Sequence, residues 1–505
     1  MKKLYLIALL LPLLGLSQVQ IGDAIKSAVV SYDFGNAVAI SDDGQIVAIG
    51  DWQDYGNGTR AGCVKVYENI AGSWYQIGAN IQGENVGDKA GIDVAISADG
   101  TIVAIGAMDY DGIDYNSIGQ VKVFENQNGS WVLLGEPILG QRVSEQSGRS
   151  VSLSSDGTIV AIGGPEQNSG SVLSDRRGRV RVFEYVNNSW VQIGNELVGD
   201  NLFDRFGWSV SLSSNGMVLA AGAPNNDENG ENSGQVSVYE NQGGNWVQIG
   251  QSIHGEAQGD ESGRSISLSG DGSRLVIGAW KNDGNGGGSG HVRIYENANG
   301  NWLQMGDDID GEDPLDKSGF SVSISRDGNT LAIGSPDNIH PEIGPLQAQY
   351  GGPAGQVRVY RLTEGEWVKQ WIDINSEAYR DKFGSSVALS ADGDTLIAGA
   401  TDAELPPIWM RGHARVFDLA VFLSLATQDH KSTGLKLYPN PTKDQFTIQL
   451  NNSSDLRDIH IYNNLGQLVL TSKETTVDTS KLALGLYLVE VETARGKSIK
   501  KLIIE

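Results

Sequence analysis

The chain of 505 residues has little of what disulfide-stabilised proteins and many enzymes depend on. It contains one cysteine, Cys63, so no disulfide can form within the chain. Its six histidines show no spacing typical of zinc ligands, and it has neither a Gly-x-Ser-x-Gly motif nor a phosphate-binding glycine loop. After the first 17 residues, no apolar run reaches about 18 residues, the length that crosses a membrane. We therefore expect no transmembrane segment, no catalytic residues and no cofactor.

Positive charge is also scarce. The chain has 37 basic and 62 acidic residues, a net charge of −25. The imbalance lies in residues 19–430, with 25 basic and 54 acidic residues, whereas residues 431–505 have 10 and 8. Because an acidic surface repels phosphate backbones and anionic lipids, we expect no nucleic-acid partner.

Glycine is abundant instead, with 66 residues, and much of it belongs to repeated turns. The turn Ser-x-[Asp/Asn]-Gly occurs seven times, with its glycine at positions 44, 100, 157, 216, 272, 328 and 393. Apolar and polar residues alternate on both sides of it, the pattern of a β-hairpin. A third strand of the form Gly-x-Val-x-Val-[Tyr/Phe] follows, and then a fourth that begins with Trp. Four strands in about 57 residues predict a blade, and seven copies predict an all-β, seven-bladed β-propeller.

The count of fourth strands indicates how the ring closes. Seven hairpins are followed by only six strands that begin with Trp, the strands of Trp74, Trp131, Trp190, Trp246, Trp302 and Trp367. Residues 18–25 align with residues 190–197, with Gln18 in place of Trp190. We expect this N-terminal strand to complete the last blade and to protect its edge. The six Trp are interpreted as core residues.

Residues 1–17 have the features of a secretory signal peptide. Lys2 and Lys3 precede an apolar run from residue 4 to residue 16, and Gly15 and Ser17 are small residues before the expected cleavage site. The predicted organisation is a signal peptide at 1–17, a propeller at 18–424, a linker at 425–434 and a final domain at 435–505. Without a disulfide, stability must come from packing and ring closure.

One hairpin runs from Phe206-Gly207 to Gly222-Ala223-Pro224, and weaker copies begin at Phe34, Phe320 and Phe383. These strands resemble the FG-GAP repeat of integrin α-chain propellers. The resemblance covers about 400 residues and implies the fold, but no particular ligand. Integrin-type repeats often carry a calcium loop between the first two strands, whereas this chain has a tight turn. We interpret one group of acids as turn formers and not as calcium ligands: Asp43, Asp99, Asp156, Asp271, Asp327 and Asp392.

Three motifs stand out in the final segment. Leu437-Tyr438-Pro439-Asn440-Pro441 opens it, residues 461–467 carry Ile-Tyr-Asn-Asn-Leu-Gly-Gln, and residues 484–491 carry a Gly-Leu-Tyr-Leu strand. The alternation predicts a small β-sandwich. The segment resembles the type A C-terminal sorting domain of the Bacteroidetes type IX secretion system. The resemblance implies that the secretion machinery recognises residues 435–505, carries the protein across the outer membrane, and releases it or leaves it on the cell surface.

Residues that depart from the repeat are the best candidates for a ligand site. Trp52 and Trp280 occupy a position at the end of the second strand where other copies have Pro, and the loop that contains Tyr350 is unusually long. Aromatic side chains on the loops of a rigid scaffold suit the binding of sugar rings or peptides, although each could instead fill a gap between blades. The candidate ligand-binding residues are Trp52, Trp208, Trp280, Tyr350 and Trp409.

Acidic residues recur three positions before a repeated glycine in the connections between blades. We interpret them as structural acceptors of backbone N–H groups, with an acidic surface ring as the alternative: Asp88, Glu145, Asp204, Asp260, Asp316 and Asp381. Two loops have alternating oxygen side chains that faintly suggest calcium binding, although tight turns explain the same composition. Their candidate metal ligands are Asp109, Asp111, Asp114, Asn225, Asp227 and Asn229.

These observations favour an exported, monomeric, non-enzymatic protein that binds an extracellular carbohydrate or protein through the propeller loops. Two alternatives remain at this stage. The propeller could be a polysaccharide hydrolase or lyase, in which case unrepeated acids should converge in a funnel. It could also be a structural surface protein without a discrete ligand.

Overall fold

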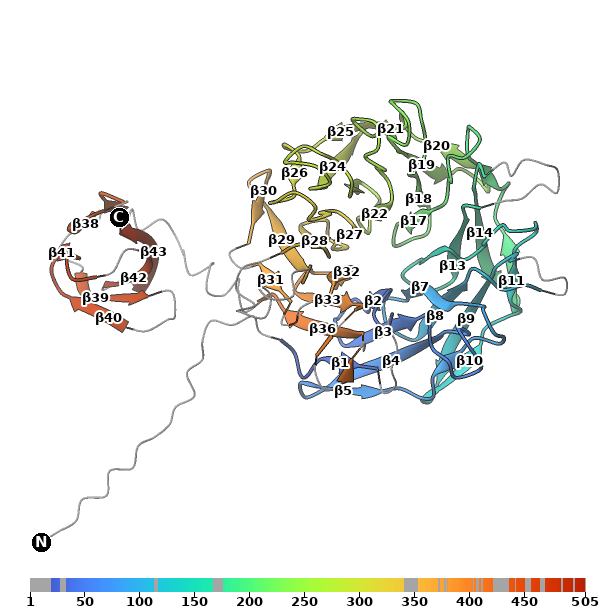
Figure 1. Cartoon of the computed structure of the whole chain (residues 1–505), viewed down its shortest axis with the longest axis horizontal. Helices are drawn as coiled ribbons and strands as arrows, with labels where there is room; N and C mark the ends of the chain where they lie inside the picture. Colours follow the sequence, from blue (N-terminus) through green and yellow to red (C-terminus); the bar gives the residue numbers. More distant parts are fainter. Residues whose placement is uncertain are drawn as a thin grey trace, which may run out of the picture. The chain divides into compact units, whose positions relative to one another are not determined.

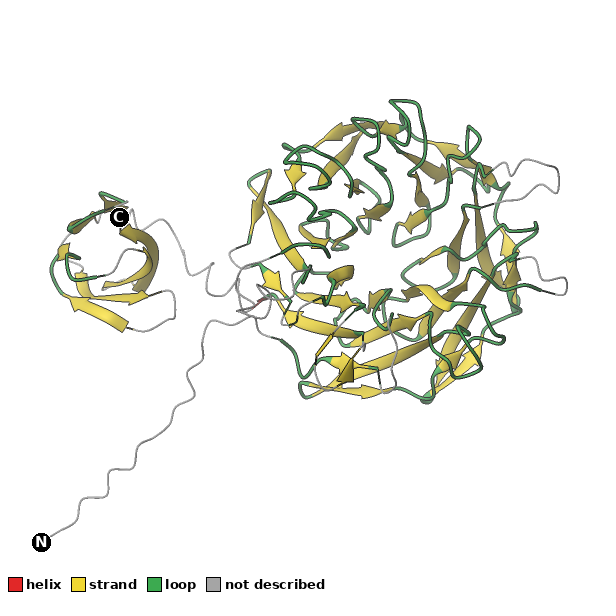
Figure 2. Cartoon of the chain, in the orientation of Figure 1, coloured by secondary structure: helices red, strands yellow, loops and turns green. Residues whose placement is uncertain are grey.

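The computed structural model describes most of the chain in segments: 20–27, 33–112, 117–166, 176–339, 353–370, 373–376, 378, 380–402, 404–405, 408–409, 412–420, 436–440, 442–449, 456–463, 468–482, 485–493 and 496–504. The predicted signal peptide, the predicted linker, Asp114 and Tyr350 lie outside these residues. The chain divides into two compact units, Gln20–Asp418 and a second unit that contains Leu419–Glu505. The described residues form strands and loops (Figure 2), and none of their helices is long and apolar enough to cross a membrane.

The first unit is a ring of antiparallel sheets, each with its first strand nearest the centre (Figure 1). In its described residues, six sheets have five strands, one has four, and β34 (Glu404–Leu405) pairs with β35 (Ile408–Trp409). The first strands are β2 (Val38–Ile40), β7 (Ala90–Ile96), β12 (Ser150–Leu153), β17 (Ser209–Leu212), β22 (Ser265–Leu268), β27 (Ser321–Ile324) and β32 (Phe383–Leu389). The second strands are β3 (Ile46–Asp51), β8 (Ile102–Ala107), β13 (Ile159–Gly164), β18 (Val218–Ala223), β23 (Arg274–Ala279), β28 (Thr330–Ser335) and β33 (Thr395–Ala400).

The outer strands follow in the same order. The third strands are β4 (Cys63–Ile70), β9 (Gln120–Gln127), β14 (Arg179–Val186), β19 (Gln235–Asn241), β24 (His291–Ala298), β29 (Gln356–Thr363) and β36 (His413–Asp418). The fourth strands are β5 (Ser73–Gln76), β10 (Ser130–Leu133), β15 (Ser189–Gln192), β20 (Trp246–Gln248), β25 (Asn301–Gln304) and β30 (Glu366–Lys369). Short strands that also pair with the third strands are β6 (Ile81–Gln82), β11 (Ile138–Leu139), β16 (Leu197–Val198), β21 (Ile253–His254), β26 (Ile309–Asp310) and β31 (Ile374–Asn375).

The N-terminal segment closes the ring, as the repeat count predicts. Gln20 bridges Phe417, and β1 (Ile25–Lys26) pairs with β36 in the register Ile25↔Ala414. The same pairing occurs in the third sheet, where Gln192 pairs with Phe183 and Leu197 with Val180. The segment therefore takes the place of a fourth strand in the last blade.

Indole N–H groups of five of the six repeated Trp connect a blade to the blade before it, whereas the Trp367 indole makes no hydrogen bond with a described residue. Trp190 donates a hydrogen bond to the carbonyl of Leu134 at 2.8 Å, and Trp74 donates to Ile21 of the closing segment at 2.8 Å. Trp131, Trp246 and Trp302 make the same contact. Of the six repeated Trp, only Trp302 is fully buried. Five of the six link neighbouring blades, which is a more specific role than the core packing expected from the sequence.

The hairpin turns form a closed belt, here called the turn ring. A backbone N–H group of each turn donates a hydrogen bond to a carbonyl group of the next turn. The bonds run from residue 42 to 98, 155, 214, 270 and 326, then from residue 327 to 391, and from 391 back to 42. Arg326 reaches inward from this ring, with Nε 2.5 Å from Oδ1 of Asp42 and Nη1 3.0 Å from Oγ of Ser214. Since these partners lie on two other turns, the Arg326 side chain spans the turn end of the channel.

Serine hydroxyls bond the first strands of neighbouring blades to each other. Ser209 donates to the carbonyl of Gly263 at 2.7 Å, and the hydroxyl of Ser211 accepts the N–H of Leu268 at 3.0 Å. Hydroxyls at the first of these positions donate in four more blades: Ser150, Ser265, Ser321 and Ser386. The strands nearest the channel have no further strand inside them, so serine satisfies backbone groups that a sheet ladder would otherwise pair.

The second unit contains two sheets with one shared core. One sheet has the order β37 (Lys436–Tyr438), β38 (Gln445–Gln449), β41 (Thr476–Asp478). The other has the order β40 (Leu468–Ser472), β39 (Leu456–Asn463), β42 (Gly485–Thr493), β43 (Gly496–Ile504). Phe446 of β38 and Ile461 of β39 belong to the same buried cluster. This arrangement is the small sandwich expected from the sequence.

Candidate functional site

A cavity of about 590 Å³ lies inside the propeller and is lined by the first strands of all seven sheets. Its walls come from the starts of those strands and from residues that follow second strands, such as Trp52, Pro336 and Thr401. These residues lie at the end of the strands opposite the hairpin turns. The cavity therefore belongs to the end that carries the loops between blades.

One position of the repeat supplies a residue to the cavity from every blade. It directly follows the glycine at or just before the start of the first strand, as Trp208 follows Gly207. The seven residues at this position all line the cavity: Asn36, Ile92, Arg149, Trp208, Arg264, Phe320 and Ser385. The next two positions of the strand vary less. The first of them is Ser in five of the seven blades, and the second is Val in six. A recognition surface that differs from blade to blade is thus built on a repeated framework.

Aromatic rings and cations gather on one side of this cavity. The guanidinium carbon of Arg149 lies 4.3 Å from the ring centroid of Trp208, and that of Arg264 lies 5.3 Å from the same centroid. Arg264 also lies 4.8 Å from Trp280 and 4.9 Å from Phe320, and these two rings meet edge to face at 5.6 Å. We call the cluster of Arg149, Trp208, Arg264, Trp280 and Phe320 the channel mouth. Its contacts are favourable cation–π geometries.

The two arginines of the channel mouth have acidic neighbours, Asp93 and Glu261, but their side chains form no ion pair with a described residue. The side chains of Arg149 and Arg264 make no hydrogen bond or ion pair with another described residue, whereas the nearby Arg205 pairs with Glu166 at 2.8 Å. Burial and the positive charge of Arg149 lower the pKa of Arg264 to about 10, although Glu261 acts in the opposite direction. Burial also lowers the pKa of Arg149, although Asp93 acts in the opposite direction. The site thus concentrates positive charge within a strongly acidic protein.

Three carboxyl groups also line the cavity, those of Asp33, Asp93 and Asp337, and Asp337 forms an ion pair with Lys317. Asp93 stands where five other blades have the first serine, and its carboxylate accepts the N–H of Val151 at 2.7 Å and of Val94 at 3.0 Å. Burial raises the pKa of Asp93 to about 6, against these hydrogen bonds and the charge of Arg149. Burial also raises the pKa of Asp33 to about 6, although the Gln53 amide donates to it. Asp33 and Asp93 are both half-buried.

The structure brings together three of the five aromatic residues proposed from the sequence. Trp208 and Trp280 belong to the channel mouth, and Trp52 lines the same cavity, with Nζ of Lys89 5.2 Å from its ring centroid. Trp409 lies in β35, and Tyr350 is outside the described residues. The indole N–H of Trp280 donates to Glu261 at 2.9 Å, which fixes its orientation.

The repeated acids between blades are buried and serve as loop caps. Asp88 accepts the backbone N–H groups of Glu84 and Asn85, and Glu145 accepts those of Gln141 and Arg142. All six are at most 3% exposed: Asp88, Glu145, Asp204, Asp260, Asp316 and Asp381. They therefore form no acidic ring on the surface, and the structural interpretation holds.

The loops considered for calcium use several of their oxygen and amide groups within the protein. Asp109 pairs with Lys89 at 2.6 Å, and Asp111 accepts the N–H of Ser117 at 3.0 Å. In the other loop, Asp227 accepts the N–H of Asn232. Asn225 also contacts Asn232, and the Asn229 amide donates to the carbonyls of Gly255 and Glu256. Calcium binding at these loops stays a prediction, and Asp114 lies outside the described residues.

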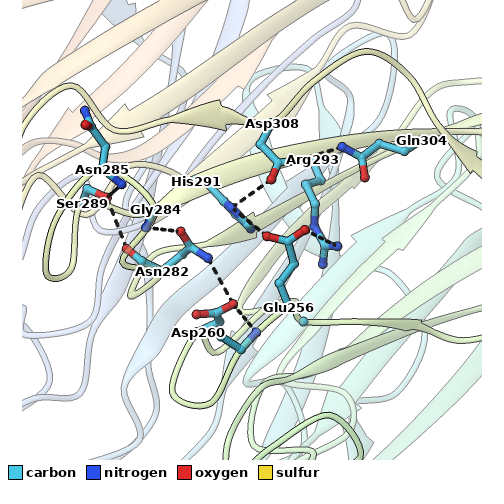
Figure 3. A network of polar contacts seen from close by, with 12 residues as sticks. Glu256, Asp260, Asn282, Gly284, Asn285, Ser289, His291, Arg293, Gln304 and Asp308 are labelled. Carbon is cyan, nitrogen blue, oxygen red and sulfur yellow. Dashed lines mark hydrogen bonds and ion pairs between the residues drawn. The ribbon is translucent and has the colours of Figure 1, made fainter.

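Two other clusters contain possible metal ligands. His291 is 1% exposed, and its Nδ1 lies 3.8 Å from Glu256 and 3.7 Å from Asp308 (Figure 3). Arg293 stands 3.7 Å from Glu256 and supplies the positive charge that a metal would otherwise supply. The other cluster joins Asp51, Asp54 and the buried Cys63, whose pKa burial raises well above its ordinary value. A raised pKa and full burial agree with the interpretation of Cys63 as a packed thiol.

The arginines of the channel mouth were missed by reasoning from the sequence. Arg149 and Arg264 look unremarkable singly, because a charged residue at the start of a strand is usually solvated. The signal that could have found them is the column of seven residues after the repeated glycine, read across all blades. Only the ring closure turns that column into one surface.

Comparisons with known proteins agree with the two-part organisation. The model of the FG-GAP repeat matches residues 201–239 and 255–295, and that of the secretion system C-terminal sorting domain matches residues 436–505. No curated protein sequence matches the chain.

Solved structures with a similar fold include Kuenenia stuttgartiensis hydrazine synthase, at 15% identity and a TM-score of 0.45, over 74% of this chain and 94% of that one. Another is a protein provisionally named a 6-phosphogluconolactonase, from Bacteroides uniformis, at 15% identity and a TM-score of 0.46, over 70% and 88% of the two chains. The chain thus joins an FG-GAP repeat propeller to a type IX secretion sorting domain, which marks proteins secreted across the outer membrane.

Proposed function

We propose that this secreted protein is a binding protein, and that its propeller holds an extracellular carbohydrate or protein at the channel mouth. The observation that carries the proposal is the difference between repeated and unrepeated residues. Trp208, Arg264 and Phe320 occupy one column of the repeat, yet the column is not conserved between blades: two aromatic rings and a guanidinium meet at one cavity. Residues needed only for folding would repeat, as the turn and serine residues do.

The cavity favours binding over catalysis. Acid–base catalysis needs a carboxyl group that is free to exchange a proton with the substrate. Both carboxylate oxygens of Asp93 are held by backbone N–H groups, and Asp33 is bonded by Gln53. The rings and cations nearby hold each other in place, which suits a preformed binding surface.

A glycoside hydrolase or lyase is the second candidate. It is favoured by one observation, the pKa of about 6 that burial gives to both Asp33 and Asp93 in the same cavity. A general acid needs such a raised pKa. Incubating the full chain with a panel of polysaccharides and measuring reducing ends and unsaturated products decides between the two functions. Product formation that Asp93→Asn abolishes would establish the enzyme.

The binding proposal is tested with a glycan and extracellular-matrix array probed with the full chain. We expect retained ligands whose signal falls at least about tenfold in Trp52→Ala and Trp280→Ala, since buried aromatic anchors dominate binding energies. Tyr75→Ala is the matched control, because Tyr75 is 56% exposed on β5 in the outer part of a blade. Binding that survives both Trp substitutions would move the site away from the channel mouth.

A further inference from the structure

We propose that the channel mouth recognises a saccharide whose end unit bears a carboxylate or sulfate group, and that Arg149 and Arg264 bind this anionic group. The inference rests on the proposed binding function and adds the chemical class of the ligand. It follows from how the two arginines are held, from what surrounds them, and from the charge of the rest of the protein.

The partners of these arginines keep their charge available. A carboxylate partner would fix a guanidinium and cancel its charge at the same time. The rings of Trp208, Trp280 and Phe320 fix it through cation–π contacts, at 4.3 to 5.3 Å from the ring centroids, and leave the charge in place. The edges of both guanidinium groups then remain free to donate two parallel hydrogen bonds to one anionic group.

Burying two positive charges close together costs free energy, and an anionic ligand would reduce this cost. Arg149 and Arg264 lie close enough to repel each other, and both are partly buried, so their charged forms are disfavoured in the free protein. Neither guanidinium group has a hydrogen bond or an ion pair with a described residue. An anion between them would relieve both penalties, whereas a neutral ligand would relieve neither.

The rest of the protein limits what kind of anion can enter. With a net charge of −25, the molecule repels a ligand that carries negative charge along its whole length. A single charged unit at the end of a saccharide feels the local arginines more than the distant acids, because exposed charges are screened beyond about 10 Å. The cavity of about 590 Å³ accepts a compact end group, and its apolar walls at Val151 and Val210 suit the C–H faces of a sugar ring.

The test compares charged and neutral ligands that are otherwise alike. The full chain is titrated by calorimetry with a glucuronate-ended oligosaccharide, with the glucose-ended oligosaccharide of the same length, and with an acidic peptide. We expect the glucuronate-ended saccharide to bind at least about tenfold more tightly than its neutral counterpart, the typical effect of a charge-assisted hydrogen bond.

Three substitutions give effects of opposite sign. Arg149→Gln and Arg264→Gln should each weaken binding of the glucuronate-ended saccharide by about 10-fold to 100-fold. Asp93→Ser should strengthen it, because Asp93 is the acid that acts on Arg149, and serine occupies this position in five other blades. A merely structural role of the arginines would not reverse sign in this way. Arg361→Gln, at an ion pair with Asp394 near the hairpin turns, is the control and should have no effect.

The outcomes distinguish the anionic-ligand proposal from the proposed binding function. Equal binding of the charged and neutral saccharides, unchanged by the arginine substitutions, would overturn the anionic ligand and leave the binding function standing. Binding of the acidic peptide alone would also overturn the saccharide assignment. If the array described above and this titration both show no ligand, the proposed function itself fails.

Discussion

At one end of the propeller, seven hairpin turns of nearly the same sequence join into the turn ring, and Arg326 spans its centre. At the other end, seven unlike residues line an open cavity. The repeated carboxyl groups of the turns also differ from those at the open end, although burial raises the pKa of Asp42, the partner of Arg326. Burial would raise the pKa of Asp99 and Asp156 in the turns, but hydrogen bonds from neighbouring hydroxyls and N–H groups outweigh it and hold each pKa below its ordinary value. At the open end, burial prevails and raises the pKa of Asp33 and Asp93.

The difference shows how a repeat protein separates stability from recognition. Repeated residues lie where every blade must make the same contact, and unrepeated residues lie where a ligand can reach them. Polar groups at the turn end are satisfied within the protein, whereas charged groups at the channel mouth are held by aromatic rings and remain unpaired.

The largest effect is expected from removing the N-terminal segment that closes the propeller ring, because both ends of the channel depend on that closure. Deleting residues 18–25 removes the pairing of Ile25 with Ala414, the bond from the Trp74 indole, and the buried Ile25 side chain. We expect a loss on the order of 5 kcal/mol, and a melting temperature lower by roughly 10 °C. Differential scanning calorimetry measures it, and deletion of residues 436–505 should leave the propeller transition in place. An unchanged melt after the first deletion would show that closure is dispensable.

A smaller effect should distinguish the acids at the channel mouth. Asp93→Ser should stabilise the protein by about 1–2 kcal/mol at pH 7, after allowance for the two lost backbone hydrogen bonds. The folded pKa of about 6 lies above the ordinary 3.8, so the folded state takes up the proton more readily. The wild type therefore loses stability as pH rises from about 4 to about 6, and the variant should lose less, because only Asp33 then remains of the two cavity acids with a pKa of about 6. Urea denaturation at pH 4 and pH 7 tests this, and the same gain at both values would contradict it.

Arg326→Ala should open the turn end at a cost of about 1 kcal/mol, since it removes a partly exposed ion pair and one hydrogen bond. Arg361→Ala is the comparison, because the Arg361–Asp394 pair joins only two neighbouring blades. Denaturation curves of both variants measure the difference. A cost for Arg326→Ala no larger than that for Arg361→Ala would argue against its spanning role.

The smallest effect is expected within the repeated turns. Asp156→Asn should change stability by less than about 0.5 kcal/mol at pH 7, because Asn215 already makes the same contacts in the next turn. The lowered folded pKa of Asp156 means that its carboxylate stabilises the protein above pH 4 and that this contribution is lost as pH falls further. The variant should therefore be less sensitive to acid than the wild type. Thermal melts at pH 7 and pH 3 test both statements, and a large loss at pH 7 would contradict them.

The framework was predictable from the sequence because it repeats. The glycine of each turn and the alignment of residues 18–25 with residues 190–197 gave the hairpins and the closing strand in the correct register. The sorting domain was recognised from three local motifs. These features depend on neighbours in sequence or on a period, and both can be read along a single chain.

The site was only partly predictable. Trp52, Trp208 and Trp280 could be selected because aromatic residues outside a repeat are rare. Trp52 and Trp208 do line one cavity, and Trp280 contacts Arg264 at that cavity. Arg149 and Arg264 could not be selected in that way, because their significance lies in the absence of an ion pair with a described residue, a property of the folded ring. The sugar-stacking role expected for the Trp rings also changes, since protein cations already lie over the rings of Trp208 and Trp280.

The N-terminal closing segment affects the order in which the protein is synthesised and folds. Ile25 is made early and Ala414 late, so the ring cannot close until nearly the whole propeller has been synthesised. The sorting domain at residues 436–505 comes only after that point. A chain that stops within the last blade therefore lacks both its closure and its export signal. Ring closure and the sorting domain thus depend on the same final part of synthesis. A chain that carries the sorting domain therefore also carries every strand that the propeller needs to close.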